Sequence, residues 1–249
     1  MLELDKIHLG DCLELMPSIP SKSIDMILCD LPYGTTDCKW DSIIDMGSLW
    51  AQYERVIKDN GAVVLTAQGM FCAKLMTYKD RWFSHDYVWI KNMHSNVGLT
   101  GIQPHRYFEN VLVFRPPRKH PPYTFNFDNR VKRQFVSKKN DLKRNMFGKD
   151  RKDKEHISKE YENYPTNVLY FDVERGQHPT QKPVPLFEYL IKTYTNEGAT
   201  VLDNCSGSGT TAIACLNSNR HFICIERDEA YYKKSLDRIA DHEPLLRLI

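Results

Sequence analysis

The sequence predicts an α/β protein with a doubly wound, mostly parallel sheet. Short apolar runs rich in β-branched residues alternate along the chain with segments of helical spacing, a pattern typical of strands joined by helices. The chain has 249 residues and 41% apolar content, enough for one large core with a smaller appendage. Seven strands are expected, at residues 4–9, 24–29, 62–66, 87–90, 109–114, 199–202 and 221–225.

Helices are expected between most of these strands, and each has a recognisable start or stop. Pro17 stops the first one, and Asn60-Gly61 is a helix-stop signal for the second. Pro183 stands at the start of a later helix, where a missing N–H costs nothing. The expected helices lie at 12–16, 47–58, 71–78 and 183–194, from the glycine turn after residue 203 to residue 216, and at 228–240.

The tetrapeptide Asp30-Leu31-Pro32-Tyr33 follows the apolar run 24–29. Ligands of open α/β sheets bind at the carboxyl ends of the strands, so this loop is a candidate site. Pro32 has a fixed φ and restricts Leu31 to extended geometry, so the backbone is stiff. A carboxylate, a carbonyl and an aromatic ring are therefore expected to face one small pocket.

Charge is unevenly distributed, although the formal net charge is only +2. Residues 115–160 hold fifteen Lys and Arg against six Asp and Glu, which leaves the rest of the chain acidic. The segment is also rich in Pro and Asn and has little periodicity. A separate basic module suits a polyanion, with nucleic acid as the first candidate.

The cysteines and the N-terminal residues bound the class of protein. The seven cysteines are odd in number and form no C-x-x-C, which argues against a disulfide framework and a zinc site, so no metal is expected. The opening residues 1–6 lack a signal peptide's basic start and apolar stretch, and no run is long enough to span a membrane. We expect a cytoplasmic protein without a membrane partner. A homodimer remains open.

The segment 203–211 is a glycine turn between a strand and a helix. Gly207 and Gly209 allow the backbone to turn tightly and approach a ligand at the start of the helix. With Ala212 they also fit a dinucleotide-binding loop, so a nicotinamide-dependent oxidoreductase must be considered. Against it, only one helix follows Glu226, and Asp203 places a negative charge where a pyrophosphate would lie.

A cationic ligand with a ribose fits this turn better, and S-adenosylmethionine is such a ligand. Its sulfonium and amino groups tolerate Asp203, its ribose suits Glu226, and its adenine needs a polar partner such as Asp11. This cofactor unit is Rossmann-like and lies at the C-terminal end, so strands that precede it must complete the sheet. That arrangement is circularly permuted, and it places residues 4–9 beside the strand that ends at Glu226.

At this point the chain resembles the β group of amino-methylating DNA methyltransferases, a permuted class with many restriction-modification and phage enzymes. Leu31 departs from the family, which more often has proline there, but only its carbonyl is needed. The matching pieces, in order, are Gly10-Asp11, Ser23-x-Asp25, Asp30-Leu31-Pro32-Tyr33-Gly34, His178-Pro179-Thr180-Gln181-Lys182-Pro183, Asp203 to Thr211, and Glu226.

The resemblance implies three regions: a catalytic half at 1–114, a basic target-recognition region at 115–170 and a cofactor-binding half at 171–249. It places Thr180 and Lys182 near the methionine part of the cofactor. Residue chemistry alone supports the same place for Lys182, because its cation can pair with the carboxylate of the cofactor. Double-stranded DNA is the expected partner. The residues expected to bind it are Lys132, Arg133, Lys138 and Lys139.

A stacked base cannot present its amine to a sulfonium, so the target base should be flipped out. Tyr33 would stack on it, while Asp30 and the Leu31 carbonyl each accept one amino hydrogen and direct the nitrogen lone pair at the methyl group. By the resemblance, Asp30 favours adenine N6, and a serine there would favour cytosine N4. Cytosine N4 stays the alternative. A DNA-binding protein that has lost catalysis is less consistent with an intact Asp30 and Tyr33.

Overall fold

The computed structural model describes residues 1–34, 44–95, 101–117, 123–127, 131–138, 155–161, 165–174 and 181–242, with the backbone alone for 131–138 and 155–161. The chain divides into two compact units. The larger comprises Met1–Asn126 and Asn167–Ile249, and the smaller comprises Phe127–Thr166. Each unit has a sheet of its own.

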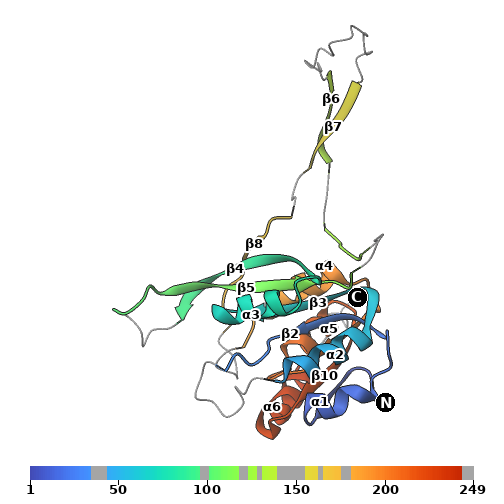
Figure 1. Cartoon of the computed structure of the whole chain (residues 1–249), viewed down its shortest axis with the longest axis vertical. Helices are drawn as coiled ribbons and strands as arrows, with labels where there is room; N and C mark the ends of the chain where they lie inside the picture. The colour runs from blue at the N-terminus through green and yellow to red at the C-terminus, as the bar shows by residue number, and fades with distance from the viewer. Residues whose placement is uncertain are drawn as a thin grey trace. The chain divides into compact units, whose positions relative to one another are not determined.

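The larger unit is built on a mixed sheet (Figure 1). The order of its strands is β1-β10-β9-β2-β3-β5-β4-β8. β5 runs antiparallel to both its neighbours, β3 and β4, and the other pairs are parallel. The strands are β1 (Lys6–Leu9), β2 (Ile24–Cys29), β3 (Ile57–Ala67), β4 (Phe83–Ser95), β5 (Arg106–Phe114), β8 (Val168–Tyr170), β9 (Thr200–Asp203) and β10 (His221–Glu226).

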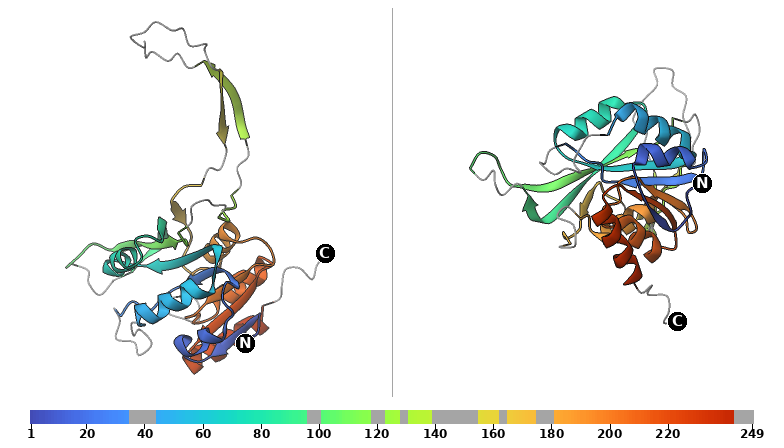
Figure 2. Two further views of the ribbon diagram at one scale, coloured as in Figure 1. Left: turned by 45° about the vertical axis from the view of Figure 1, so that its right-hand side comes forward. Right: turned by 90° about the horizontal axis from the view of Figure 1, so that it is seen from below.

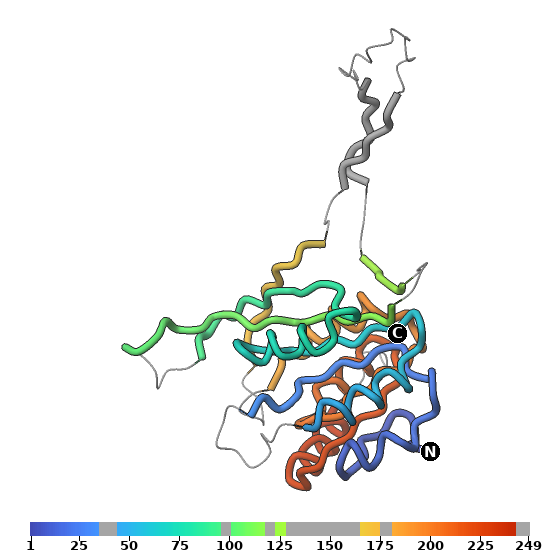
Figure 3. Tube along the Cα trace, in the orientation of Figure 1, coloured from blue at the N-terminus to red at the C-terminus, as the bar shows by residue number. Residues whose placement is uncertain are grey.

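The permuted order of the strands is confirmed. β1 pairs in parallel with β10, with Leu9 opposite Glu226. β2 pairs in parallel with β9, with Met26 opposite Val201. Figure 3 follows the same junction along the trace, where the blue N-terminal segment lies beside the red C-terminal segment. Segments far apart in the sequence therefore reach one edge of one sheet.

Helices cover both faces of the sheet (Figure 2). Successive residues of β2 point to opposite faces, so Ile27 and Cys29 pack toward α1, α2 and α3, while Met26 and Leu28 pack toward α4 and α5. α6 adds partly buried side chains to the second face. The helices are α1 (Cys12–Leu15), α2 (Met46–Val56), α3 (Met70–Tyr78), α4 (Val184–Tyr194), α5 (Thr210–Asn217) and α6 (Glu229–Ala240), with a 3-10 turn, η1 (Met16–Ser18), after α1.

Local sequence signals explain where several helices begin. The Asp45 carboxylate accepts the amide of Ser48 at 2.7 Å, and the Asp228 carboxylate accepts the amide of Ala230 at 2.9 Å. Each satisfies an amide that has no partner within its helix. Pro183 stands at the N-cap of α4. No helix among the residues that the structure describes is both long and apolar enough to cross a membrane.

The number of strands corrects the prediction, because the sheet has eight strands instead of seven in the part described. The additional strand is β8, which pairs in parallel with the outer edge of β4. It has three residues, too few to show the alternation that marks a strand. β8 also belongs to the larger unit, although the sequence placed residues 115–170 together in the basic region.

Gly61 also has a different role from the predicted one. α2 ends at Val56 and β3 begins at Ile57, so Asn60-Gly61 lies inside a strand and does not stop a helix. The register between β2 and β3 shifts at this place, and a Cβ on Gly61 would lie 2.7 Å from the Asp25 carbonyl oxygen. Glycine is needed for close approach of two strands.

The smaller unit contains an antiparallel pair, β6 (Val131–Lys138) and β7 (Glu155–Tyr161). The sequence showed little periodicity here because charged residues stand next to one another, as Lys132 and Arg133 do. By sequence, this unit holds twelve Lys and Arg against seven Asp and Glu. It therefore keeps a basic excess when taken alone.

Candidate active site

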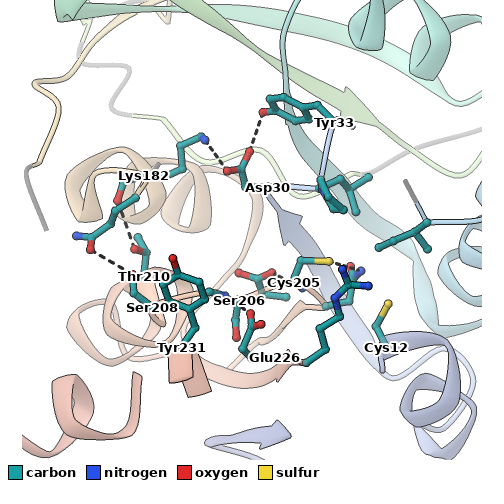
Figure 4. A pocket seen from close by; sticks show the side chains of 18 of the residues that line it. Cys12, Asp30, Tyr33, Lys182, Cys205, Ser206, Ser208, Thr210, Glu226 and Tyr231 are labelled. Atoms are coloured by element: carbon teal, nitrogen blue, oxygen red, sulfur yellow. Dashed lines mark hydrogen bonds and ion pairs between the residues drawn. The ribbon is translucent and has the colours of Figure 1, made fainter. Parts of the chain in front are cut away.

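Four neighbouring strands end at one edge of the larger unit, and an acidic residue stands at each end. Asp11 follows β1, Asp30 follows β2, Asp203 ends β9 and Glu226 ends β10. They border a cavity of about 350 Å³. Figure 4 shows the tetrapeptide on one side of it and the glycine turn with Glu226 on the other. The two stretches that the sequence singled out share one cavity.

Asp30 is held by three side chains. Its Oδ1 accepts hydrogen bonds from the hydroxyls of Tyr33, at 2.7 Å, and Thr66. Its Oδ2 accepts one from the Lys182 ammonium at 2.5 Å. Burial and the adjacent carboxylate of Asp30 raise the pKa of Tyr33, so its phenol stays protonated and can donate. These contacts fix the carboxylate at the end of β2.

The ring of Tyr33 is supported from behind by Phe71, with a centroid distance of 5.0 Å and an interplanar angle of 36°. The side chain of Leu31 is buried in the core, with 4% exposure, and this anchors the tetrapeptide turn. Pro32, Leu31 and Tyr33 all line the cavity. The stiff turn expected from the sequence is therefore anchored on both sides.

Lys182 belongs to a chain of alternating charges. Its Nζ lies 3.5 Å from Oε2 of Glu109, and the Lys91 ammonium donates to Oε1 of Glu109 at 2.9 Å. Burial alone opposes the charge of Lys182, but the carboxylates of Asp30 and Glu109 raise its pKa. Burial likewise opposes the charge of Glu109, but Lys182 and Lys91 lower its pKa. Lys182 and Glu109 are therefore both charged at neutral pH.

The glycine turn presents Glu226 to the cavity. Oε2 of Glu226 accepts the amide of Gly207 at 2.7 Å, and Oε1 accepts the amide of Asp228 at 2.8 Å. Gly207 and Gly209 have φ values of +51° and +79°, which favour glycine. Burial raises the pKa of Glu226, and the two amides oppose the rise. The Ser206 hydroxyl, also at the cavity, is buried with no hydrogen-bond partner among the described residues.

Asp203 is 3% exposed, and its surroundings shift the pKa of its carboxyl group strongly. Burial raises its pKa to about 7, although hydrogen bonds from the Thr211 hydroxyl and the Cys205 amide oppose the rise. It is therefore partly protonated near neutral pH. A cation in the cavity would favour its ionised form.

Asp11 combines a local structural role with a place at the cavity. Its carboxylate caps α1 by accepting the amide of Leu13 at 2.8 Å, and the residue lines the cavity. The capping role is enough to account for an aspartate at this position. The carboxylate still has lone pairs with which it can accept hydrogen bonds from a ligand.

The structure brings most of the predicted site residues together. Gly209 is the exception in the glycine turn, since it starts α5 in the left-handed conformation and does not line the cavity. Lys132, Arg133 and Lys138 lie in β6, where only the backbone is described, and Thr180 and Lys139 lie outside the described residues. The predicted residues that border the cavity are Asp11, Asp30, Leu31, Pro32, Tyr33, Lys182, Asp203, Gly207 and Glu226.

Around Asp30 and Lys182, Thr66 and Glu109 were not predicted as site residues. Both were placed within predicted strands, but Glu109 was expected near the start of one, far from the edge where parallel strands end. Because β5 is antiparallel, its first half reaches that same edge. If the strand had been taken as antiparallel, the glutamate ahead of the apolar run 111–114 would have been expected at the edge where the parallel strands end.

No group of His, Cys, Asp and Glu among the described residues could hold a metal ion. The six cysteines in that part of the chain are free, and all but Cys205 are buried. Cys12 and Cys205 border the cavity.

Comparison with known proteins gives consistent matches over nearly the whole chain. The family described as DNA methylase matches residues 24–237. The type II methyltransferase M.HpaI of Haemophilus parainfluenzae is 29% identical over 248 residues, covering 92% of this chain and 72% of the relative. The DNA adenine methyltransferase YhdJ of Escherichia coli K12 is 29% identical over 259 residues, covering 94% of this chain and 81% of the relative.

Two solved structures share the fold. The M1.HpyAVI–SAM complex has a TM-score of 0.63 at 23% identity, over 94% of this chain and 98% of that one. The cytosine-N4-specific PvuII DNA methyltransferase has a TM-score of 0.68 at 18% identity, over 96% of this chain and 87% of that one.

Proposed function

The chain belongs to the DNA methylase family, and from this premise we propose that it transfers a methyl group from S-adenosylmethionine to N6 of adenine in double-stranded DNA. The observation that carries the proposal is the shared cavity, in which the Asp30 carboxylate faces the glycine turn and Glu226. The hydrogen-bond acceptor for the target amine and the binding site for a nucleoside cofactor therefore lie in the same cavity.

The cavity suits the cofactor chemically. Ser206 offers a buried hydroxyl that lacks a partner among the described residues, and Asp203 is a buried carboxyl group that a cation would ionise. We assign Glu226 to the ribose hydroxyls, Asp11 to the adenine, and Lys182 to the methionine carboxylate. Thr180 and the glycine turn complete the proposed binding set. When bound, S-adenosylmethionine supplies an electrophilic methyl group on a sulfonium.

Asp30 and the Leu31 carbonyl are proposed to accept the two hydrogens of the target amine, which turns its lone pair toward the methyl group. The phenol of Tyr33 donates to Asp30, and Phe71 supports its ring. The ring is thereby held ready to stack on a flipped base. N6 gains the methyl carbon and must release one proton, and we assign that proton to the Asp30 carboxylate, from which it passes to water.

The choice of adenine rests on Asp30 and not on the fold. The cytosine-N4-specific PvuII enzyme shares this fold with a TM-score of 0.68, so the architecture alone does not select adenine. The acidic first residue of the tetrapeptide favours adenine by family resemblance. The relative named as a DNA adenine methyltransferase supports the same choice. Cytosine N4 remains the alternative product.

The smaller unit is proposed to recognise the target sequence, because its basic excess suits the phosphate backbone. A cytoplasmic location, where DNA is accessible, belongs to the same proposal. The homodimer that the sequence leaves open is decided by size-exclusion chromatography with light scattering.

The test is methyl transfer to DNA with tritium-labelled cofactor, followed by mass analysis of the nucleosides. We expect N6-methyladenine, whereas N4-methylcytosine would select the alternative and an absence of label would refute the proposal. Asp30→Ala should abolish transfer and leave cofactor binding nearly intact. Asp59→Ala is the matched control, since Asp59 is an exposed aspartate paired with Lys22 at 3.1 Å. Equal activity of Asp30→Ala and wild type would show that the pocket is assigned wrongly.

A further inference from the structure

The Lys182 ammonium lies between two carboxylates at unequal distances. It is 2.5 Å from Oδ2 of Asp30 and 3.5 Å from Oε2 of Glu109. The side chain of Lys182 is 7% exposed and that of Glu109 is 14% exposed, so water screens the group only weakly. Figure 4 shows Lys182 directed at Asp30 across the top of the cavity.

Only one of the two carboxylate oxygens of Glu109 accepts a hydrogen bond among the described residues. Its Oε1 accepts the Lys91 ammonium at 2.9 Å, whereas Oε2 is buried and has no hydrogen-bond partner among the described residues. A buried carboxylate oxygen without a hydrogen bond is costly, so natural proteins rarely leave one without a reason. The Lys182 ammonium lies 3.5 Å from this oxygen, just beyond ordinary hydrogen-bond length.

Asp30, in contrast, already accepts three hydrogen bonds, out of about four that a carboxylate can accept. Oδ1 accepts from both Tyr33 and Thr66, and Oδ2 accepts from Lys182. A target amine that donates to Oδ2 of Asp30 therefore has to approach the oxygen that the Lys182 ammonium already holds. The ammonium hinders this approach, because a charged donor binds a carboxylate more strongly than a neutral amine does.

We propose that Glu109 is a positioning residue that takes over the Lys182 ammonium when the target amine occupies Oδ2 of Asp30. The inference rests on the proposed function and adds a step to it. Lys182 needs to move by only about 1 Å to reach ordinary hydrogen-bond length with Oε2. The charges of the group do not change in number, so the movement exchanges one ion pair for another inside the same site.

Replacing Glu109 with glutamine tests the step. Glutamine has nearly the same shape but no charge, so Lys182 keeps Asp30 as its only carboxylate partner among these residues. We expect single-turnover methyl transfer to slow by about 10- to 100-fold, the weight of one hydrogen bond to a charged group. Cofactor affinity should stay within about twofold, because Lys182 keeps its charge and its proposed contact with the methionine carboxylate.

Two further variants separate this role from a structural one. Glu109→Asp keeps the charge and should recover a large part of the rate. Glu54→Gln removes a carboxylate that pairs with Lys79 at the surface and should leave the rate unchanged. Wild-type turnover in Glu109→Gln would overturn the proposal, and so would a loss in Glu109→Gln that tracks a loss of cofactor binding or of thermal stability.

A measurement without DNA distinguishes this inference from the proposed function. In protein with ¹⁵N-labelled lysine, the Lys182 ammonium signal is assigned with Lys182→Arg. In Asp30→Asn we expect that signal to stay protected from solvent exchange, because Glu109 now holds it, and to lose protection when Glu109→Gln is added. If the wild type methylates no DNA but this protection pattern is observed, the proposed function is wrong, whereas the inference that Asp30 and Glu109 share the Lys182 ammonium is supported. Lost protection in Asp30→Asn alone overturns the inference.

Discussion

The pKa of Asp203 makes cofactor binding depend on pH in a defined direction. Burial raises this pKa to about 7, so about one tenth of the free protein carries an ionised Asp203 at pH 6 and about half at pH 7. If the cationic cofactor binds only the ionised form, its affinity rises about fivefold between these pH values, or about 1 kcal/mol. Binding should also release about 0.9 proton at pH 6 and about 0.5 at pH 7.

Calorimetric titration in two buffers of different ionisation enthalpy measures both quantities. Asp203→Asn should abolish the proton release and flatten the affinity profile. Glu226→Gln is the matched comparison, because burial also raises the pKa of Glu226 but its carboxylate is assigned to an uncharged ribose. This variant should weaken binding at every pH and keep the proton release. Proton release that persists in Asp203→Asn, or a flat wild-type profile, would refute the reasoning.

The same shift has a consequence for the free protein. The pKa of Asp203 is higher in the folded state than the ordinary 3.8 of the unfolded chain. The contribution of this group to stability is therefore greatest at low pH and is lost as the pH rises from about 4 toward 7. Asp203→Asn should be less sensitive to pH in thermal unfolding over that window, which also shows that the variant is folded.

Three other predictions concern different parts of the molecule. Reversing the charges of Lys132, Arg133, Lys138 and Lys139 should weaken DNA binding and reduce the slope of log affinity against log salt by about 0.9 for each phosphate that is no longer neutralised, whereas an unchanged slope would make them ordinary surface residues. Tyr33→Phe keeps the ring but removes the donor to Asp30, so single-turnover transfer should fall by about 10- to 100-fold, and wild-type turnover would show that this hydrogen bond is idle. Gly61→Ala should lower the free energy of unfolding in urea by about 1–3 kcal/mol, because its Cβ would meet the Asp25 backbone at 2.7 Å, and Gly47→Ala, with no atom nearer than 3.4 Å, should not.

The strands beside the site could be predicted from sequence because their boundaries are marked. β2 spans Ile24–Cys29 as expected, since Pro20 and Pro32 bracket an apolar run that only Asp25 interrupts. β4 spans Phe83–Ser95 and is longer than the predicted 87–90. The sequence pattern missed its last residues because most of them are polar or exposed. Hydrophobic pattern therefore located the buried half of the sheet and missed the parts that do not pack against helices.

The site was predictable where a residue follows directly from the end of a parallel strand. Asp30, Asp203 and Glu226 all meet that condition, and they share the cavity. Glu109 escaped because its position depends on the direction of β5, and strand direction has no local signal in the sequence. The pairing of Lys182 with Asp30 is a contact between residues 152 positions apart, which no spacing rule contains.

The position of β9 between β2 and β10 has a consequence for synthesis on the ribosome. One edge of β2 pairs with β3, which follows soon after it, but the other edge waits for β9, with Met26 opposite Val201. During translation the catalytic strand therefore keeps an open edge of unpaired amides and carbonyls while most of the polypeptide emerges. Because β2 must wait for a strand so distant along the chain, closure of the sheet at this position slows folding.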